Sequence, residues 1–415
     1  MQCNLFRKLE GAAFVALIAL LLTSSTSAQS YKVLYTFTGG SDGNGPNSPL
    51  AMDAAGNLYG TTSTGGAYGW GTVFKLAQNS AGTWTESVLY SFTGGTDGRE
   101  PMQPVSLDAA GNIYGTTAYG GDVGGVDCSV GPWYCGVIFK LAPNADGTWT
   151  ESVLYSFDGN YGWNASGVVL DAAGNLYGTT DYGGECVYEL TPNSDGSWTF
   201  NVVFAFDETN GLDPFSPLLT WDSAGNLYGT TAYGGRGTDC WNGTCGLVYE
   251  LAPSGGGWDE TIIHSFMGGN DGATPFTGLV FDKAGNLYGT TYENGSGGYG
   301  TVFRITSWGG KWKNQVIHAF SGSDGQGPLG MMVFDRRGRL YGVTQYGGRY
   351  GNGTVYQMVR NSSGQWTEKT IHNFVGYKDG SGPTGGLSID AAGNLYGASG
   401  QNSSHGYGVI FEITP

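Results

Sequence analysis

The chain has 415 residues, of which 76 are glycine, 14% are aromatic and only 13% are charged, and its formal net charge at pH 7 is −16. An acidic surface repels phosphate backbones, so the charge balance argues against nucleic acid as a partner. The glycine- and aromatic-rich composition is typical of many short strands joined by tight turns, and no helical periodicity occurs after the N-terminal segment.

The N-terminal segment, residues 1–28, has the pattern of a signal peptide. Two basic residues, Arg7 and Lys8, precede an apolar run that is too short to span a bilayer, and the segment ends in small residues. We expect cleavage before Gln29. No second apolar run follows, so the mature chain, residues 29–415, is expected to be one soluble domain without a membrane span, secreted or held in the periplasm.

The mature chain repeats one unit seven times. Each copy contains the phrase Asp-x-x-Gly-Asn-Leu-Tyr-Gly or a close variant, such as DAAGNLYG from Asp53 and DRRGRLYG from Asp335. A short strand ends at the Asp, whose carboxylate can cap the turn amides, while the turn glycine supplies a positive φ and a second strand begins at the Leu. The copies, 51 to 63 residues apart, begin at Asp53, Asp108, Asp171, Asp222, Asp282, Asp335 and Asp390.

The second unit shows the four strands of one repeat. Strands are predicted over 104–108, 113–117, 135–142 and 148–157, with tight turns after the first and third strands and long glycine-rich loops after the second and fourth. In the fourth strand, a Trp is followed six residues later by Tyr, Phe or His, and two residues after that by Phe. Because even spacing puts side chains on one face of a strand, we expect all three to pack against the next unit.

The two ends of the mature chain complement each other. Residues 31–37 have the pattern of a fourth strand without the first three, and residues 383–415 that of three strands without a fourth. The repeat therefore predicts an all-β fold, a seven-bladed β-propeller of four-stranded antiparallel blades in which 31–37 closes the ring by joining the last blade. A solenoid is the alternative, but it would leave exposed edges at both ends.

Two cysteine pairs bracket loops at the same point of their repeats. They are Cys128 with Cys135 and Cys240 with Cys245, and in an exported protein two local disulfides are expected, with zinc ligation as the alternative. Cys186 falls at a strand position that is apolar in other repeats, which indicates a buried free thiol.

The repeats resemble the Gloeo/Verruco-type, or choice-of-anchor, tandem repeats of exported bacterial proteins with unassigned activity. The likeness lies in the D-x-x-G-N-L-Y-G-T-T cores and in the G-T-V-F-K-L-type strands at 71–76 and 300–305, and it extends over 31–415. It implies a β-propeller-like repeat fold and export. Such proteins often end in a sorting anchor, and no such pattern occurs here, so the resemblance favours secretion or periplasmic residence over surface attachment.

In a propeller, the loops after the second and fourth strands share one face. These are the long, variable loops of this chain, so binding is expected on that face near the central channel. Aromatic side chains in these loops could stack on sugar rings or contact a protein; the alternative is that they only pack beneath the loops. The candidates are Trp70, Trp133, Trp163 and Trp241, with Tyr119, Tyr182, Tyr233 and Tyr346 at a recurring Tyr-Gly-Gly position.

An Asp-Gly pair recurs in the loop before the first strand. Carboxylates beside glycine can bind Ca²⁺, but these loops lack the dense Asp spacing of a dedicated calcium loop, and a turn-forming role is the simpler interpretation. No cofactor is otherwise expected. The five residues are Asp42, Asp97, Asp271, Asp324 and Asp379.

Residues suited to catalysis are few. His264, His318 and His372 occupy the fourth-strand position that carries Tyr in other repeats, so they are interpreted as structural. We expect a monomeric, non-catalytic binding or scaffold protein that recognises an extracellular polysaccharide or protein. The alternative is a glycoside hydrolase or lyase at the channel mouth. Its candidate residues, all in long loops, are Glu185, Glu293 and His405.

Overall fold

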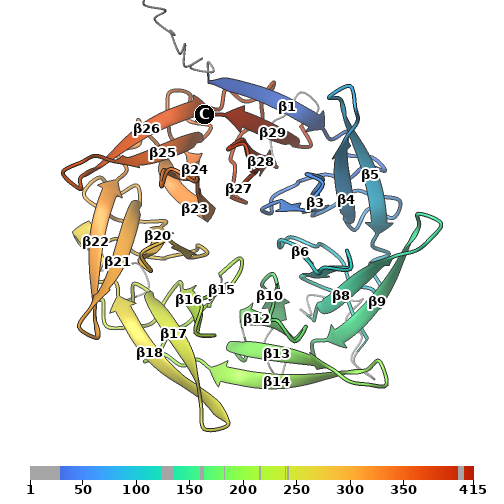
Figure 1. Cartoon of the computed structure of the whole chain (residues 1–415), viewed down its shortest axis with the longest axis horizontal. Helices are drawn as coiled ribbons and strands as arrows, with labels where there is room; N and C mark the ends of the chain where they lie inside the picture. The colour runs from blue at the N-terminus through green and yellow to red at the C-terminus, as the bar shows by residue number, and fades with distance from the viewer. Residues whose placement is uncertain are drawn as a thin grey trace, which may run out of the picture.

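The structure is a computed structural model that describes residues 29–122, 135–158, 163–181, 183–214, 216–238, 240, 243–400 and 406–415. Within these ranges the strands form seven antiparallel sheets, which stand as blades around a central axis (Figure 1). The predicted signal peptide lies outside the described residues, as do Cys128, Trp133, Tyr182, Trp241 and His405, and the side chain of Trp163 is not described.

Blades 1 to 4 follow one another along the chain, each with its first strand innermost and its fourth strand outermost (Figure 1). Blade 1 comprises β2 (Ala51–Met52), β3 (Leu58–Thr62), β4 (Thr72–Gln78) and β5 (Trp84–Ser91), and blade 2 comprises β6 (Ser106–Leu107), β7 (Ile113–Thr116), β8 (Val137–Pro143) and β9 (Trp149–Ser156). Blade 3 has a divided inner strand, β10 (Trp163–Ala165) and β11 (Val169–Leu170), then β12 (Leu176–Asp181), β13 (Cys186–Pro192) and β14 (Trp198–Ala205). Blade 4 comprises β15 (Thr220–Trp221), β16 (Leu227–Thr231), β17 (Leu247–Ser254) and β18 (Gly257–Ser265).

The remaining blades complete the circle. A single 3₁₀ turn, η1 (Gly269–Asp271), precedes blade 5, which comprises β19 (Val280–Phe281), β20 (Leu287–Thr291), β21 (Thr301–Trp308) and β22 (Lys311–Ala319). Blade 6 comprises β23 (Gln326–Phe334), β24 (Leu340–Tyr346), β25 (Thr354–Arg360) and β26 (Trp366–Asn373). Blade 7 comprises β27 (Leu387–Ile389), β28 (Leu395–Ser399) and β29 (Val409–Thr414), with β1 (Ser30–Thr36) as its outer strand.

Ring closure occurs as the sequence predicts. Strand β1 pairs antiparallel with β29, with Tyr31 opposite Ile413, and the amide of Phe37 donates a hydrogen bond to the Gly408 carbonyl at 3.0 Å. Figure 1 shows this junction between the first and last coloured segments. Because the outer strand of blade 7 comes from the opposite end of the chain, separating the ends requires breaking a complete strand pairing.

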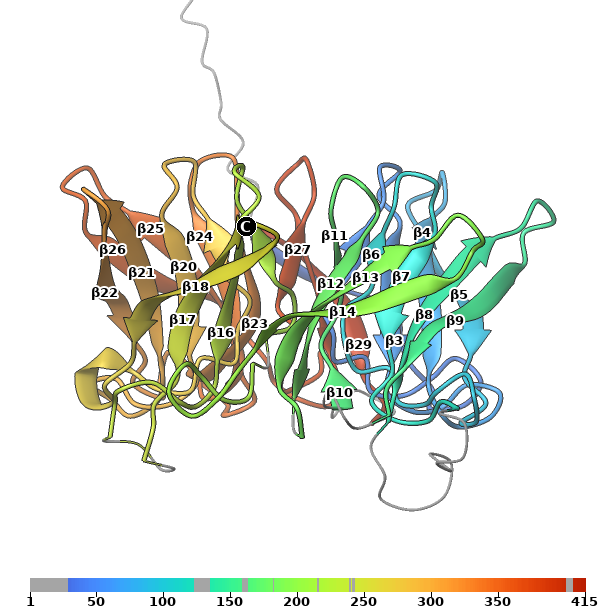
Figure 2. The same cartoon turned by 90° about the horizontal axis from the view of Figure 1, so that it is seen from below.

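The two faces of the ring differ in loop length. Figure 2 shows the long loops at one end of the ring, which we call the long-loop face, and hairpin turns at the other, the tight-turn face. Each repeat Asp caps its turn, as predicted. In blade 1, Asp53 Oδ1 accepts hydrogen bonds from the amides of Ala55 and Asn57, both at 2.9 Å, and Oδ2 accepts one from the Tyr59 hydroxyl at 3.0 Å. These seven acids are thereby placed away from the long-loop face.

The fourth strands depart from the prediction in one respect. The register between the third and fourth strands of blade 1 shifts by one residue, a β-bulge, and the same shift occurs in blades 2 to 6. Phe92 packs against Phe139 of the next blade, with ring centroids 5.1 Å apart, but Trp84 packs against Tyr396 of the preceding blade at 6.0 Å. The expectation that the Trp shares this face is wrong, because the extra residue reverses the alternation of side chains.

Neighbouring blades are joined close to the axis by threonines of the second strands. Thr179 Oγ1 donates a hydrogen bond to the Pro214 carbonyl at 2.6 Å, and Thr230 Oγ1 donates one to the Pro275 carbonyl at 2.8 Å. The Leu-Tyr-Gly glycine of each second strand allows a large aromatic residue of the third strand to approach. At Gly229 an added Cβ would lie 2.2 Å from the Tyr249 hydroxyl. Within the described residues, no helix is long and apolar enough to cross a membrane.

Candidate functional site

A cavity of about 440 Å³ lies on the ring axis at the long-loop face, a size within the usual range of small-molecule sites, about 300–1,000 Å³. All seven blades contribute to its wall, mostly through the loops that lead into their first strands. The wall combines amide side chains with apolar ones. The side chains that the following paragraphs use are Asn164, Phe276, Tyr292 and Gln345.

A row of aromatic rings from blades 4 and 5 begins at this cavity, where Phe276 and Tyr292 line the wall. The rings of Phe276 and Tyr292 are 6.2 Å apart, and Tyr233 continues the row 6.5 Å from Phe276. The Tyr292 hydroxyl donates a hydrogen bond to Gln345 Oε1 at 3.0 Å. Tyr233 was a sequence candidate, whereas Phe276 and Tyr292 were not. A comparison of repeats could have found Tyr292, because Ala118 and other small residues follow the Thr-Thr pair in most blades.

Three carboxylates gather beside the cavity, between blades 3 and 4. Asp181, Glu185 and Asp213 each offer an oxygen within 4.8 Å of the others. Asp181 is only 5% exposed, and its Oδ1 atom is buried without a hydrogen-bond partner. Burial and then the neighbouring Asp213 raise the pKa of Asp181 to about 8, while a contact with Asn164 opposes this shift and connects the group to the cavity.

Glu185 has a local structural role in this group. Its Oε2 accepts a hydrogen bond from the Asp213 amide at 2.8 Å. In blade 6 the corresponding amide, that of Gly327, donates to the backbone carbonyl of Tyr299 at 2.9 Å. The loop after β12 is short, so the Glu185 carboxylate replaces that carbonyl. Burial raises the pKa of Glu185 above its ordinary value, and the hydrogen bond from the Asp213 amide offsets only part of this shift.

The carboxylate group has two ways to relieve its internal repulsion. Asp181 can hold a proton, since burial and the adjacent Asp213 carboxylate raise its pKa to about 8. Alternatively, the carboxylates with the Asn164 amide form an all-oxygen donor set of the kind that Ca²⁺ prefers. Glu293, the other acidic candidate, is exposed and lies outside this group; its backbone pairs with Ala273.

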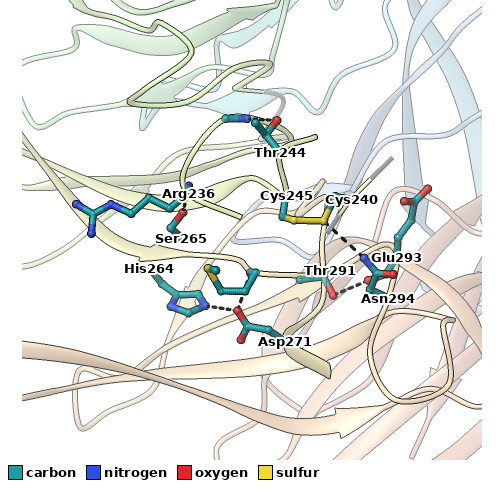
Figure 3. Close-up of a disulfide and its surroundings, with 12 residues drawn as sticks. Arg236, Cys240, Thr244, Cys245, His264, Ser265, Asp271, Thr291, Glu293 and Asn294 are labelled. Atoms are coloured by element: carbon teal, nitrogen blue, oxygen red, sulfur yellow. Dashed lines mark hydrogen bonds and ion pairs between the residues drawn. A yellow bond between two sulfur atoms is a disulfide. The ribbon is translucent and has the colours of Figure 1, made fainter. Parts of the chain in front are cut away.

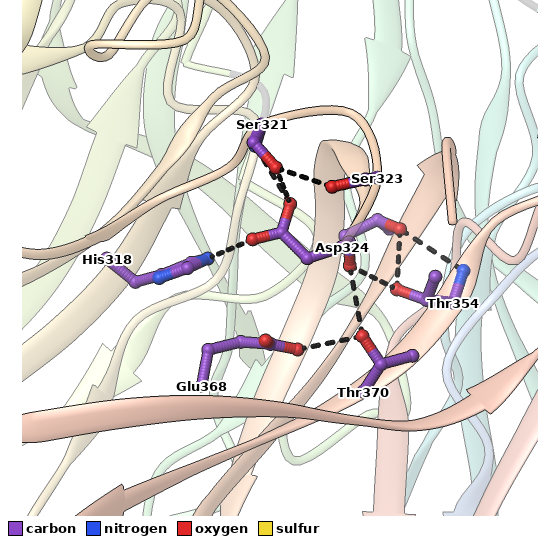
Figure 4. Close-up of polar contacts among 8 residues, drawn as sticks. His318, Ser321, Ser323, Asp324, Thr354, Glu368 and Thr370 are labelled. Carbon is purple, nitrogen blue, oxygen red and sulfur yellow. Dashed lines mark hydrogen bonds and ion pairs between the residues drawn. The ribbon is translucent and has the colours of Figure 1, made fainter. Parts of the chain in front are cut away.

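The five Asp-Gly acids stay at separate blade junctions and form turn caps. In blade 6, Asp324 Oδ2 lies 3.0 Å from His318 Nε2, and its Oδ1 accepts hydrogen bonds from the amide and hydroxyl of Ser321 (Figure 4). In blade 7 the Tyr35 hydroxyl takes the position of the histidine and donates a hydrogen bond to Asp42 Oδ2 at 3.0 Å. The structural interpretation of the histidines and of these acids agrees with this geometry. Glu368 also approaches Asp324, but both Asp324 oxygens already accept hydrogen bonds.

The aromatic candidates of the long-loop face fall into two surroundings. The Arg99 guanidinium lies 5.2 Å from the ring of Trp70 and 5.4 Å from that of Tyr119, so these two candidates enclose one cation. Trp70 also covers Gly94, and it remains 38% exposed. Tyr346 is 45% exposed at the end of β24. Trp70 and Tyr346 can therefore reach a partner, although neither lines the axial cavity.

One of the two expected disulfides is seen. Cys240 and Cys245 are bonded, with Cα atoms 5.4 Å apart, and the Asn294 amide approaches Cys240 Sγ at 3.7 Å (Figure 3). The other pair includes Cys128, which lies outside the described residues, whereas its expected partner Cys135 is buried. Cys186 is buried and forms no disulfide with another described cysteine, as predicted, and its Sγ lies 3.3 Å from the Thr180 hydroxyl.

Comparisons with known proteins agree with the fold. Residues 239–415 match the family model of the Gloeobacter/Verrucomicrobia repeat. No match was found among curated proteins. A protein of Bacteroides uniformis, provisionally named a 6-phosphogluconolactonase, is similar in structure with a TM-score of 0.53 at 15% identity, over 86% of this chain and 98% of its own. The extracellular domain of a provisionally named one-component system from B. thetaiotaomicron also has a TM-score of 0.53, at 14% identity, over 92% of this chain and 42% of its own.

Proposed function

We propose that this chain, a repeat-type β-propeller that carries the Gloeobacter/Verrucomicrobia repeat, is an exported protein that binds a neutral sugar unit of an extracellular polysaccharide in its axial cavity. The observation that carries the proposal is the composition of the cavity wall, in which Phe276 and Tyr292 face the same space as the Asn164 and Gln345 amides. Aromatic rings pack on the apolar faces of a sugar, and amides hydrogen-bond to its hydroxyl groups.

The charges around the cavity favour a neutral ligand. Among the described residues that line it, none is Lys or Arg. Asp181, Glu185 and Asp213 lie beside it, and the Arg99 guanidinium is held by two aromatic rings. A phosphorylated sugar, of the kind named in the B. uniformis protein, would meet negative charge here.

Glycan-array screening followed by calorimetry tests the proposal. The variant Phe276→Ala/Tyr292→Ala should lose at least tenfold in affinity for the glycan that the parent binds, about 1.4 kcal/mol. Alanine is compatible with the fold at the Tyr292 position, since Ala118 and Ala232 stand there in blades 2 and 4. The control is Trp308→Ala, which removes an 89% exposed aromatic on the tight-turn face. Equal affinity in parent, variant and control would exclude the axial cavity.

Export is part of the same proposal. Three observations support it: the signal-peptide pattern of residues 1–28, the Cys240–Cys245 disulfide, and the extracellular location named for the B. thetaiotaomicron domain. Mass spectrometry of the protein from the periplasm or medium of an expressing bacterium should give a chain that starts at Gln29 and behaves as a monomer. An uncleaved chain in the cytoplasm would contradict this expectation.

The second candidate function is a polysaccharide-active enzyme. The observation that favours it is Asp181, whose pKa is raised to about 8 by burial and by the neighbouring Asp213, so that its carboxyl can serve as an acid near neutral pH. The near-complete burial of Asp181 is the reason to place binding first. Turnover of a polysaccharide by the parent, lost in Asp181→Asn, would reverse this order.

A further inference from the structure

The capping turns deviate from the repeat in two adjacent blades. In five blades the two residues after the cap Asp are Ala-Ala or Ser-Ala, whereas blade 5 has Lys283 and blade 6 has Arg336 and Arg337. All three side chains are exposed on the tight-turn face, opposite the axial cavity. The turn geometry does not require them, because the uncharged turns of the other blades make the same Asp-capped hydrogen bonds.

Two clefts flank the blade 6 turn. One, of about 360 Å³, lies between the turns of blades 5 and 6, and the other, of about 400 Å³, lies between those of blades 6 and 7. Arg336 and Arg337 line both clefts, so this turn is a cationic wall that they share. The cleft between blades 5 and 6 is also lined by Lys283, Arg360 and Trp366.

Positive side chains outnumber carboxylates in these clefts. The clefts are lined by Lys283, Arg336, Arg337, Arg339 and Arg360, and by the turn-capping acids Asp282, Asp335 and Asp390. Among the described residues, the one ion pair here joins Arg339 to Asp335. The Asp335 carboxylate also accepts hydrogen bonds from its own turn amides. Lys283, Arg336 and Arg337 thus present free cations on a chain whose net charge is −16. Charges more than about 8 Å away are largely screened at physiological ionic strength, so this local charge dominates for a ligand inside the clefts.

We propose that the two clefts of blades 5 to 7 bind an acidic polysaccharide, a chain of sugar rings bearing carboxylate groups. Guanidinium groups hold carboxylates through paired, charge-assisted hydrogen bonds. Trp366, which is half-buried in the first cleft, supplies aromatic surface for a sugar ring. A chain can enter both clefts and pass the Arg336–Arg337 turn between them, whereas a flat anionic membrane would touch only their rims. The proposal is independent of the axial cavity and of the ligand proposed for it.

Polygalacturonate serves as the probe, with the mature chain and calorimetry at low and at physiological salt. The variant Arg336→Ala/Arg337→Ala rebuilds the Asp-Ala-Ala turn that four of the other blades contain, so it retains a turn that this fold accepts. It should weaken the affinity for polygalacturonate at least tenfold and flatten the salt dependence of binding. The matched control, Arg236→Ala/Arg349→Ala, removes two exposed cations from the long-loop face and should bind as the parent does.

Three results would overturn the proposal. They are a parent that does not bind polygalacturonate, equal losses in the variant and the matched control, and capture of the parent by phosphatidylglycerol vesicles but not by the polymer. Neutral dextran is the charge control and should not bind to the clefts. Phe276→Ala/Tyr292→Ala should leave polygalacturonate binding unchanged, so a failure at the axial cavity and a failure at the clefts give different results.

Discussion

Three glutamates at the outer blade junctions make the stability of this ring depend on pH. Glu86, Glu151 and Glu260 occupy the same position of their fourth strands, two residues after the Trp, and each has its Oε1 atom buried without a hydrogen-bond partner. Burial, with a smaller contribution from an aspartate of the preceding junction, raises the pKa of each to about 7. Asp42 is this neighbour for Glu86.

The sign of the effect follows from the direction of the shift. A carboxyl whose pKa is raised in the folded state favours folding when it is protonated, so its contribution is complete below pH 4.5 and disappears as the pH rises to about 7. A shift from 4.5 to about 7 corresponds to a ceiling of about 3.4 kcal/mol per site. Because these carboxyls are half-exposed and solvent screens them, we expect about 1–2 kcal/mol each. The parent should therefore lose about 3–6 kcal/mol between pH 4.5 and pH 8 from these sites.

The triple variant Glu86→Gln/Glu151→Gln/Glu260→Gln tests this reasoning. Blade 5 already has an amide at this position, where Asn314 Nδ2 donates to Asp271 Oδ1 at 2.9 Å. The variant should match the parent near pH 4.5, exceed it at pH 8, and have a flatter profile of urea-unfolding free energy against pH. Glu368→Gln is the control and should change the profile less, since Thr370 and His318 counteract burial at Glu368. Parallel profiles for parent and triple variant would refute the assignment.

Three further predictions concern single features of the fold. Tyr249→Phe should raise the free energy of unfolding, measured by urea titration, by about 1 kcal/mol, because the buried Tyr249 hydroxyl has no hydrogen-bond partner. Blades 1, 2 and 5 already carry Phe at this position. A loss of stability would show that the hydroxyl has a partner after all. Cys240→Ser/Cys245→Ser should cost about 2 kcal/mol, the value for so short a loop, and the parent in reductant should match it. Asp181→Asn should stabilise the chain at pH 9 but not at pH 4, since the pKa of Asp181 is about 8. The control Asp146→Asn, on the tight-turn face, should not stabilise the chain at pH 9. If the difference in unfolding free energy between Asp181→Asn and the parent is the same at every pH, the raised pKa is excluded.

The ring and its closure could be predicted because one phrase fixes them. The Asp cap, the positive-φ glycine and the Leu-Tyr-Gly strand require a tight turn at each copy, and the complementary ends of the chain require Tyr31 and Ile413 to meet. The bulge of the fourth strands escaped prediction. A shift of one residue leaves no mark in composition, yet it moves Trp84 from one blade interface to the other.

The candidate site was predicted less completely, since it depends on contacts between blades. Asp181 and Asp213 come from different repeats, and only the turn around the axis brings them together. The hydrogen bond of Glu185 depends on the shortness of its own loop, which a list of acidic residues does not show. Trp133 and Trp241 remain predictions, because they lie outside the described residues.

A repeat propeller contains its own comparison set, and the way in which a blade deviates separates structure from function. His318 replaces Tyr but keeps the contact with the junction aspartate, so the exchange preserves the structure and indicates no ligand. Asp181 differs from its counterparts in other blades and leaves its Oδ1 atom without a hydrogen-bond partner beside the axial cavity. Arg336 differs from its counterparts and places a charge without an ion-pair partner in a cleft. The Tyr249 hydroxyl is also unpartnered, but it is sealed in the core, where no ligand can reach it. A deviation that both loses its internal partner and borders open space is therefore the signal that selects the axial cavity and the cationic clefts.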